Sequence, residues 1–381
     1  MADGSVGGFT KDRFAAVREG FAANFASGAD VGASFAATIE GETVVDIWGG
    51  FADEARTRPW VRDTIVNVYS TTKTMTALTA LLLADRGELD FDAPVARYWP
   101  QFAANGKERV KVSHLMSHAA GLSGWKEPIT KEDLYDWDKA TALLAAQAPY
   151  WEPGTASGYH AMTQGYLVGE VVRRITGRSL GTVFREEIAE PLGADFFIGL
   201  PASEDAQVAD LIPPPPGSGI SDGPQSELSA NMSTNPPVDP LETRTRAWRA
   251  AEIPAANGHG NARSIAEIHA VLANGGVAKG KRILSEAGCR KALEVQIEGT
   301  DLILNMPVRF GMGFGLPGSM VPLPNPNTLY WGGYGGSLAI IDMDARTTFA
   351  YAMTKMAPTT TGDMRAMGLV MAMWQAMANP G

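Results

Sequence analysis

The sequence has one cysteine, five histidines and no long apolar run, and each scarcity narrows the classes of protein that it can encode. With Cys289 alone, no internal disulfide can form, which fits a reducing compartment, and we expect a cytoplasmic location. The first residues show no charged segment followed by an apolar one, so we expect no signal peptide. The longest apolar-leaning stretch, 75–84, is too short to span a bilayer.

Basic residues are scarce relative to acidic ones. The 381 residues include 32 Lys and Arg against 42 Asp and Glu, which gives a formal net charge of −10. Proteins that bind nucleic acids or anionic membranes usually need a basic face. We therefore expect neither a nucleic-acid partner nor a membrane partner. The chain is long enough for a large core in two lobes.

The two ends of the chain are predicted to form strands, and the middle to be mostly helical. Alternating apolar residues and glycine-bounded turns predict strands at 31–39, 43–48, 327–331, 337–342 and 347–354. Helical spacing and helix-ending glycines predict helices at 9–25, 71–86, 131–147, 162–176, 180–187, 264–274 and 364–377. We therefore expect an α+β fold in which both ends build one antiparallel sheet flanked by helices.

These predicted elements divide the chain into two lobes. Residues 1–66 and 277–381 are expected to form an α/β sheet lobe, and residues 67–276 a mostly helical lobe, with the active site between them. Residues 211–240 form an irregular segment rich in Pro, Gly, Ser and Asn. We expect a surface loop there, or alternatively a flap at the mouth of the active site.

A serine and a lysine one helical turn apart are the first candidates for chemistry. Ser70 begins an apolar helix, and Lys73 lies on the same face of that helix. At a helix N-terminus, free amide donors and the positive end of the helix dipole favour a developing anion. The same dipole and partial desolvation favour the neutral form of Lys73, which suits a proton acceptor. The ordinary alternative is that Ser70 only caps the helix.

Two glycine-rich stretches supply the other candidates. Tyr159 lies at the end of the segment 152–160, whose proline, glycines and small polar residues describe a tight approach loop. In isolation, a tyrosine at such a position is more often a core or capping residue than a catalytic one. The stretch 330–337 contains four glycines around a predicted strand, which permits close approach of its backbone. Such a strand either presents an amide to a substrate carbonyl or is simply a twisted edge.

In this order and spacing, the three stretches resemble the serine β-lactamase and penicillin-binding-protein superfamily, and more specifically its class C-like branch, which includes the family VIII carboxylesterases. Linking segments resemble the same family, namely His114–Leu122, Gly177–Leu180, Glu190–Gly193, Phe310–Phe314 and Gly335–Ser337. The likeness runs over almost the whole chain. It implies a serine β-lactamase-like fold, with an α/β sandwich beside a helical lobe, and no metal or cofactor.

The resemblance also implies a role for each candidate residue. Ser70 would be the nucleophile, with Lys73 and Tyr159 handling its proton. The backbone amides of Ser70 and Tyr334 would form the oxyanion hole. The residues that it implies for substrate contact are Trp331, Gly332 and Gly333. His160 is also expected to face the substrate, because it is next to Tyr159 in the chain.

Two departures from the family pattern bear on the substrate. The asparagine of the family's Y-x-N motif is Ala161 here, and the cationic or imidazole side chain of its third motif is Trp331. Trp331 cannot pair with a carboxylate, and the W-G-G form resembles that of family VIII esterases. We therefore predict a carboxylesterase that cleaves short-chain, uncharged, small-molecule esters through an acyl-enzyme on Ser70.

Several other activities are compatible with the same scaffold. The chain could act as a β-lactamase, as a D-amino-acid peptidase or transesterase, or as a non-catalytic penicillin-binding-like sensor. The joint presence of Ser70, Lys73 and Tyr159 favours an enzyme over a sensor. His114 and His118 are four residues apart, but no H-E-x-x-H motif is present, so no metal site is predicted. The sequence leaves open whether Lys73 or Tyr159 is the immediate base, and it leaves open the oligomeric state.

Overall fold

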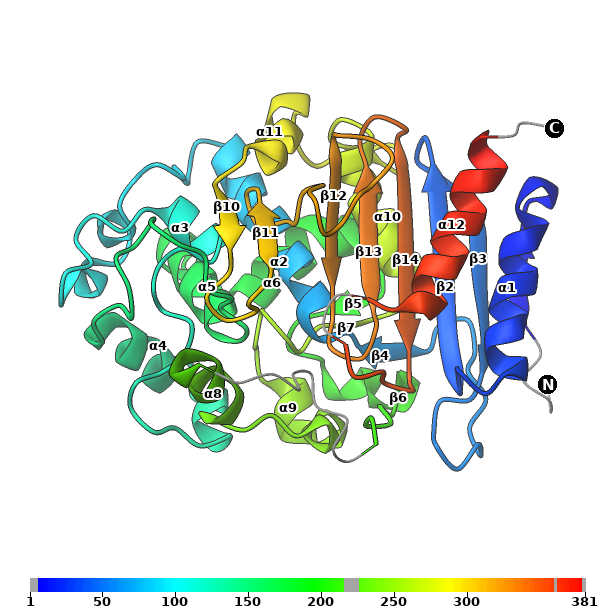
Figure 1. Cartoon of the computed structure of the whole chain (residues 1–381), viewed down its shortest axis with the longest axis horizontal. Helices are drawn as coiled ribbons and strands as arrows, with labels where there is room; N and C mark the ends of the chain where they lie inside the picture. The colour runs from blue at the N-terminus through cyan, green and yellow to red at the C-terminus, as the bar shows by residue number, and fades with distance from the viewer. Residues whose placement is uncertain (1–5, 216–225, 360–361, 379–381) are drawn as a thin grey trace.

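The two ends of the chain meet in one sheet. The structure is a computed structural model that describes residues 6–215, 226–359 and 362–378. The antiparallel six-stranded sheet has the order β1 (Gly7–Thr10), β3 (Glu42–Gly50), β2 (Gly32–Ile39), β14 (Thr347–Met353), β13 (Leu338–Asp342), β12 (Thr328–Gly332) (Figure 1). The two ends join where Phe35 of β2 pairs with Tyr351 of β14. The predicted α+β fold is confirmed.

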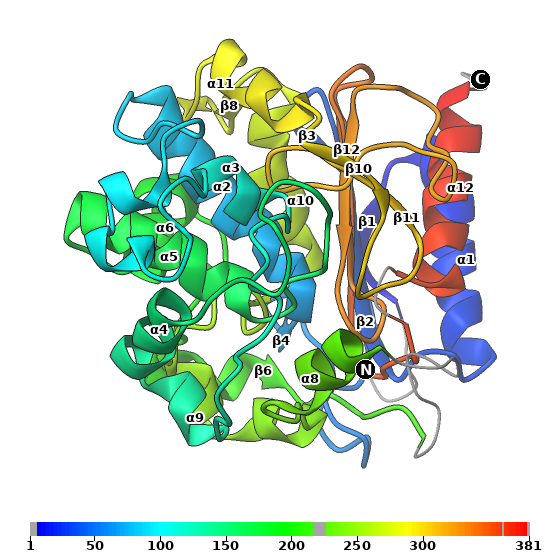
Figure 2. The same cartoon turned by 60° about the vertical axis from the view of Figure 1, so that its left-hand side comes forward.

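Helices cover both faces of this sheet. On one face, α1 (Ala15–Ala26) and α12 (Met364–Ala378) pack against each other through buried residues such as Phe21 and Leu369. On the other face, α10 (Ala262–Ala273) lies against β2 and β14, and Figure 2 shows the sheet nearly edge-on between the two helical layers. One of the helices that cover the sheet, α10, therefore comes from residues 67–276. We had expected this whole segment to form the helical lobe.

The second lobe is built around α2 (Thr72–Asp85), which is buried along nearly its whole length. Among the described residues, the other α-helices are α3 (Val112–Met116), α4 (Trp137–Ala146), α5 (Thr163–Thr176), α6 (Leu180–Phe184), α7 (Glu190–Leu192), α8 (Glu227–Thr234), α9 (Arg246–Ala250) and α11 (Glu286–Arg290). Because α11 packs against α2, the helical lobe also extends beyond residue 276. Within the described residues, no helix combines the length and the apolar character needed to cross a membrane.

Three smaller β-structures complete the fold. One has the order β5 (Phe196–Phe197), β7 (His259–Gly260), β4 (Ile65–Asn67), β6 (Val208–Ala209). The others are the hairpins β8 (Val277–Ala278) with β9 (Lys281–Arg282), and β10 (Ile297–Thr300) with β11 (Pro307–Phe310). The sequence did not predict β1 or the strands β5 to β11. Strands of two to four residues are too short to show a clear alternation of apolar and polar residues.

Two predicted helices begin later than expected. The helix predicted at 9–25 begins at Ala15, because residues 7–10 pair with β3 as a strand, with Gly7 and Gly8 closely packed on the Trp48 ring. The helix predicted at 131–147 begins at Trp137, because the Asp136 side chain accepts the backbone N–H of Lys139 and caps it.

Candidate active site

Ser70 lies in a sharp turn between a short strand and a long helix. β4 is followed by a 3-10 turn, Tyr69–Thr71, which leads into α2. Tyr69 has a φ of +43°, a left-handed conformation that costs energy for a residue with a Cβ. The Thr72 hydroxyl donates a hydrogen bond to the Tyr69 carbonyl at 2.5 Å and so helps to hold this conformation. The turn places Ser70 at the N-terminal end of α2.

The structure brings Ser70, Lys73 and Tyr159 together. The Nζ of Lys73 lies 3.1 Å from the Ser70 Oγ, and the Tyr159 hydroxyl donates a hydrogen bond to the same oxygen at 2.6 Å. Ser70 lies in the turn that leads into α2, and Lys73 lies in the first turn of α2. Tyr159 comes from the loop before α5. Both proton-transfer candidates thus contact the candidate nucleophile directly.

Burial governs the protonation of Lys73. Its side chain is fully buried, and Nζ contacts the carbonyl oxygens of Ala161 at 2.7 Å and Ala255 at 2.9 Å. Within the described part of the chain, no carboxylate compensates its charge. Desolvation therefore lowers the pKa of Lys73 well below its usual value. The lysine is suited to accept a proton.

Tyr159, unlike Lys73, is held in its protonated form. Burial raises the pKa of Tyr159 to about 12, and the negative charge of Asp301 acts in the same direction. Hydrogen bonds with Ser70 and with the Trp331 side chain act against this rise. Tyr159 therefore keeps its proton at neutral pH and is suited to donate it.

Asp301 is a neighbour of Tyr159 that the sequence analysis missed. It lies in the loop between β10 and β11 and is fully buried. One of its carboxylate oxygens accepts the backbone N–H of Tyr159 at 3.1 Å, and the other accepts the Ser157 hydroxyl at 2.6 Å. No motif or spacing in the sequence distinguishes it from a surface aspartate.

The turn after β12 lies against the segment that precedes Ser70. The Ser337 hydroxyl donates a hydrogen bond to the Val68 carbonyl at 2.8 Å, and the Gly333 N–H donates to the Ser337 carbonyl at 2.8 Å. A Cβ on Gly333 would lie 2.2 Å from the Val68 oxygen, so only glycine fits this approach. Among the described residues, the backbone N–H of Tyr334 has no acceptor, and it is therefore free to bind an oxyanion.

An apolar hollow of about 40 Å³ adjoins Tyr159. Trp331 and Gly332 form one wall, and none of the described residues that line it is charged. The residues that complete the wall are Leu304, Met306, Pro307, Val308, Phe310, Val321 and Tyr330. The hollow therefore suits an uncharged group.

Part of the Pro-rich segment packs against residues of the candidate site. Leu228 and Met232 of α8 pack against the cluster that contains Tyr159 and Trp331. Ser226 starts this helix by accepting the N–H of Ser229 with its side chain. α8 therefore lies beside the candidate site, and the flap alternative stays a prediction; residues 216–225 lie outside the described residues.

His160 does not face the hollow as we had expected. Its side chain is fully buried, Nδ1 contacts the Gly158 carbonyl at 2.5 Å, and Nε2 accepts the N–H of Leu122 at 3.1 Å. Burial lowers the pKa of His160 to about 4, so the ring is neutral. With both ring nitrogens engaged, His160 braces the loop behind Tyr159 and contributes no group to the hollow.

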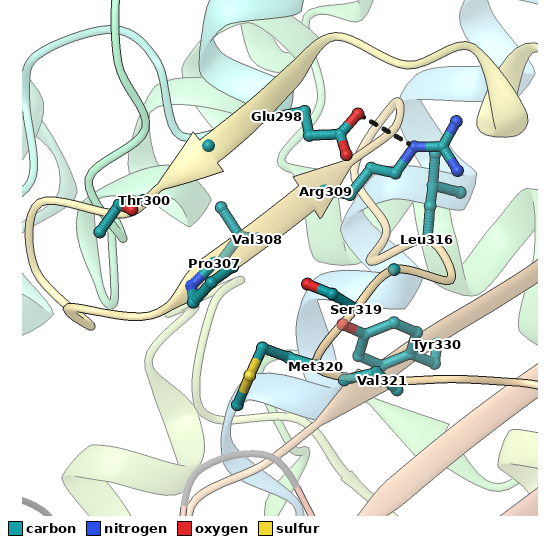
Figure 3. Close-up of a pocket in the computed structure, with 12 residues that line it drawn as sticks. Glu298, Thr300, Pro307, Val308, Arg309, Leu316, Ser319, Met320, Val321 and Tyr330 are labelled. Carbon is teal, nitrogen blue, oxygen red and sulfur yellow. Dashed lines mark ion pairs between the residues drawn. The ribbon is translucent and has the colours of Figure 1, made fainter.

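A second hollow of about 200 Å³ shares Pro307, Val308, Val321 and Tyr330 with the first (Figure 3). Arg309 lines it but pairs with Glu298 at 3.5 Å, the contact dashed in Figure 3. Arg309 also donates to the Pro317 carbonyl at 3.2 Å. Arg309 therefore lines only the second hollow and is absent from the described lining of the apolar hollow beside Tyr159.

Comparisons with known proteins agree with this geometry. The protein family described as "Beta-lactamase" matches residues 21–370 of the chain. The "Esterase/beta-lactamase LipL" of Mycobacterium tuberculosis is 35% identical over 371 residues, which cover 91% of this chain and 82% of LipL. The "Esterase EstB" of Burkholderia gladioli is 33% identical over 181 residues, which cover 43% of this chain and 45% of EstB.

Solved structures give the same result. The crystal structure of a family VIII carboxylesterase shares 45% identity with a TM-score of 0.93, over 98% of this chain and 100% of its own. A penicillin-binding-protein homologue from Caulobacter crescentus shares 41% identity with a TM-score of 0.92, and the match covers 98% of this chain and 100% of the homologue. Together with a family match over almost the whole length, these likenesses confirm the resemblance that the three motifs predicted: the chain belongs to the beta-lactamase family.

Proposed function

We propose that the protein is a carboxylesterase of the family VIII type that cleaves short-chain, uncharged esters through an acyl-enzyme on Ser70. The observation that carries the proposal is the contact of Tyr159 and Lys73 with one serine oxygen, at 2.6 and 3.1 Å. The likeness to a family VIII carboxylesterase and to two proteins named as esterases supports it.

Lys73 is the immediate base in this proposal. The carbonyl oxygens of Ala161 and Ala255 can only accept hydrogen bonds. A neutral amine that donates its two protons to these carbonyls directs its lone pair at the third neighbour, Ser70. Because Tyr159 donates to the same serine oxygen, the serine proton is left free to point at Lys73.

Acylation then follows from the geometry. The Ser70 oxygen forms a bond to the ester carbonyl carbon while its proton passes to Lys73. The amides of Ser70 and Tyr334 bind the oxyanion, and such a donor is typically worth about 3 kcal/mol. The bond to the alcohol oxygen breaks as Tyr159 gives that oxygen its proton.

The cycle closes when the protons return. Lys73 passes its proton to Tyr159, whose ring centroid lies 5.0 Å from Nζ. Water then attacks the acyl carbon and gives a proton to Lys73. The bond from this carbon to the Ser70 oxygen breaks, that oxygen takes the proton back from Lys73, and the carboxylic acid leaves. Since Tyr159 serves the leaving oxygen and lines the apolar hollow, that hollow holds the alcohol part of the ester.

β-Lactam cleavage is a second candidate activity, because the name of LipL includes both activities. Two observations make it the weaker one. The apolar hollow has no charged side chain among its described lining residues, and Arg309 in the neighbouring hollow is paired with Glu298. A complete set of Ser70, Lys73 and Tyr159 disfavours a non-catalytic sensor.

A substrate panel tests the proposed function. We expect kcat/KM for p-nitrophenyl butyrate to exceed that for the cephalosporin nitrocefin by at least about a hundredfold, which is about 2.7 kcal/mol in transition-state binding. Esters with acyl chains of increasing length identify the preferred acyl group. Equal values for the ester and for nitrocefin would overturn the assignment.

A further inference from the structure

Asp301 is a buried charge held by hydrogen bonds. Its Oδ1 accepts the backbone N–H groups of Tyr159 at 3.1 Å, Ile303 at 2.9 Å and Leu304 at 2.9 Å. Its Oδ2 accepts the Ser157 hydroxyl at 2.6 Å. Among the described residues, no basic side chain pairs with it. An ionised carboxylate needs such a set of donors when it is removed from water.

These contacts join two parts of the site that are far apart in the sequence. The Leu302 N–H also donates to the Ser157 carbonyl at 2.8 Å, so the loop before Tyr159 and the loop of the β10–β11 hairpin are joined at three points. The same hairpin supplies Phe310 to the wall of the apolar hollow. Asp301 therefore fixes the backbone of Tyr159 relative to the wall against which the alcohol lies.

The ring of Tyr159 also needs this support. Its edge meets the ring of His118, with centroids 5.0 Å apart, and the Trp331 ring lies 6.1 Å away. These contacts limit sideways movement of the ring, whereas the hydrogen bond to Asp301 holds the backbone from which the ring extends. A shift of about 1 Å at a reacting group can cost about a hundredfold in rate.

We propose that Asp301 is a positioning residue for proton transfer: it holds Tyr159 with the hydroxyl aimed at Ser70 and at the leaving alcohol oxygen. This inference rests on the proposed function, because it assigns Asp301 a part in the step that Tyr159 performs. Its negative charge acts in the same sense, since it raises the pKa of Tyr159 and keeps the proton in place before the reaction.

The dependence on the leaving group separates this role from a merely structural one. A p-nitrophenolate ion leaves readily without a proton, whereas an alkoxide needs one. A general loss of active protein lowers kcat/KM equally for p-nitrophenyl butyrate and for ethyl butyrate, which share one acyl group. Misalignment of the proton donor lowers kcat/KM more for ethyl butyrate.

The experiment compares both esters in four variants of the full chain. Tyr159→Phe gives the reference for complete loss of the donor, and Asp301→Ala and Asp301→Asn test the inference. Glu170→Gln is the matched control, because Glu170 is a buried carboxylate that accepts hydrogen bonds from Trp137, Arg173 and Arg174 within the helical lobe. Melting temperatures are measured for all four.

We expect Asp301→Ala to lose at least about tenfold more kcat/KM on ethyl butyrate than on p-nitrophenyl butyrate. Asp301→Asn keeps an oxygen that accepts the Tyr159 N–H. We therefore expect its loss of kcat/KM on ethyl butyrate to exceed its loss on p-nitrophenyl butyrate by no more than about threefold. Removing the charge lowers the pKa of Tyr159, so the loss of activity at alkaline pH begins at a lower pH in Asp301→Asn. Glu170→Gln leaves the ratio of the two esters unchanged.

The outcomes separate the two proposals. If Tyr159→Phe shows the excess loss and Asp301→Ala does not, the inference about Asp301 is wrong and the proposed function stands. If Tyr159→Phe itself shows no excess loss, Tyr159 is not the proton donor, and the mechanism under the proposed function is overturned. Should Asp301→Ala fail to fold, Ser157→Ala removes one anchor only, and an unchanged ester ratio in that variant overturns the inference.

Discussion

The indole of Trp331 stacks on the imidazole of His118, with ring centroids 5.4 Å apart and planes inclined by 26°. His118 is fully buried, and burial, then the neighbouring His160 and Lys73, lowers its pKa well below the usual value. The position at which the family carries a cationic or imidazole side chain is thus an uncharged aromatic stack. This arrangement is the physical basis for expecting neutral substrates.

Trp331→Ala tests the size of the alcohol pocket. Removing a buried tryptophan opens a cavity and typically costs about 3–5 kcal/mol, so we expect a lower melting temperature. The enlarged hollow should improve kcat/KM for esters of branched alcohols relative to ethyl esters with the same acyl group. Kinetics on the two ester series check this, and an unchanged preference would place the alcohol elsewhere.

The depressed pKa of Lys73 predicts the pH dependence of the reaction. Burial lowers this pKa, so the amine is neutral over a range in which an exposed lysine is charged. We expect kcat/KM to fall as the pH falls through the lowered pKa, because the protonated amine cannot accept the proton of Ser70. A pH profile with p-nitrophenyl butyrate measures this acidic limb.

Lys73→Arg provides the control for this profile. Arginine keeps hydrogen-bond donors but does not lose its proton in the accessible range. We expect a loss of at least about a hundredfold at every pH, since general base catalysis contributes about 10²- to 10⁴-fold. A variant that keeps substantial activity would show that Lys73 holds Ser70 in place without accepting its proton.

Tyr159 and Lys73 should behave as one unit in a double-mutant cycle. We expect Tyr159→Phe and Lys73→Ala each to lower kcat/KM for ethyl butyrate by about 10²- to 10⁴-fold. The double variant should lose much less than the product of the two, because the two residues act as one proton-transfer unit around Ser70. Losses that multiply fully, or a loss under about threefold for Tyr159→Phe at an unchanged melting temperature, would contradict the mechanism.

The close approach at Gly333 predicts that this position tolerates only glycine. An added Cβ would lie 2.2 Å from both the Val68 oxygen and the Ser337 Oγ, so the end of β12 must move away from Ser70. We expect Gly333→Ala to lower kcat/KM by at least about a hundredfold through the displaced Tyr334 amide. Gly368→Ala in α12, where a Cβ would meet nothing within 4 Å, is the matched control and should keep full activity.

The parts of the site that could be predicted from the sequence are those encoded locally. Ser70 lies in the 3-10 turn that leads directly into α2, and Lys73 lies in the first turn of α2, so their spacing of three residues brings them together. Tyr159 was predicted only through the resemblance, because nothing local shows that its loop folds back on α2. Within the fold, long alternating or helical segments such as β2 and α5 were predicted to within one or two residues.

The remainder depends on long-range packing. Asp301 is 142 residues from Tyr159, and its role becomes visible only when the β10–β11 hairpin is placed. His160 follows Tyr159 directly, yet its side chain is turned into the interior by its bonds to Gly158 and Leu122. The packing of α10 against the sheet was not foreseen for the same reason, since amphipathic spacing shows that a helix packs but not against which partner.

The most direct test of the account is the site of acylation. The protein is incubated with a slowly hydrolysed acyl or phosphonate ester, and the adduct is located by intact-protein and peptide mass spectrometry. The account predicts one covalent adduct per chain, carried on Ser70 and absent from Ser70→Ala, which should keep its melting temperature and lose ester hydrolysis. An adduct on Ser337 or on Ser123, which begins a second S-x-x-K sequence, would contradict it, as would full activity in Ser70→Ala.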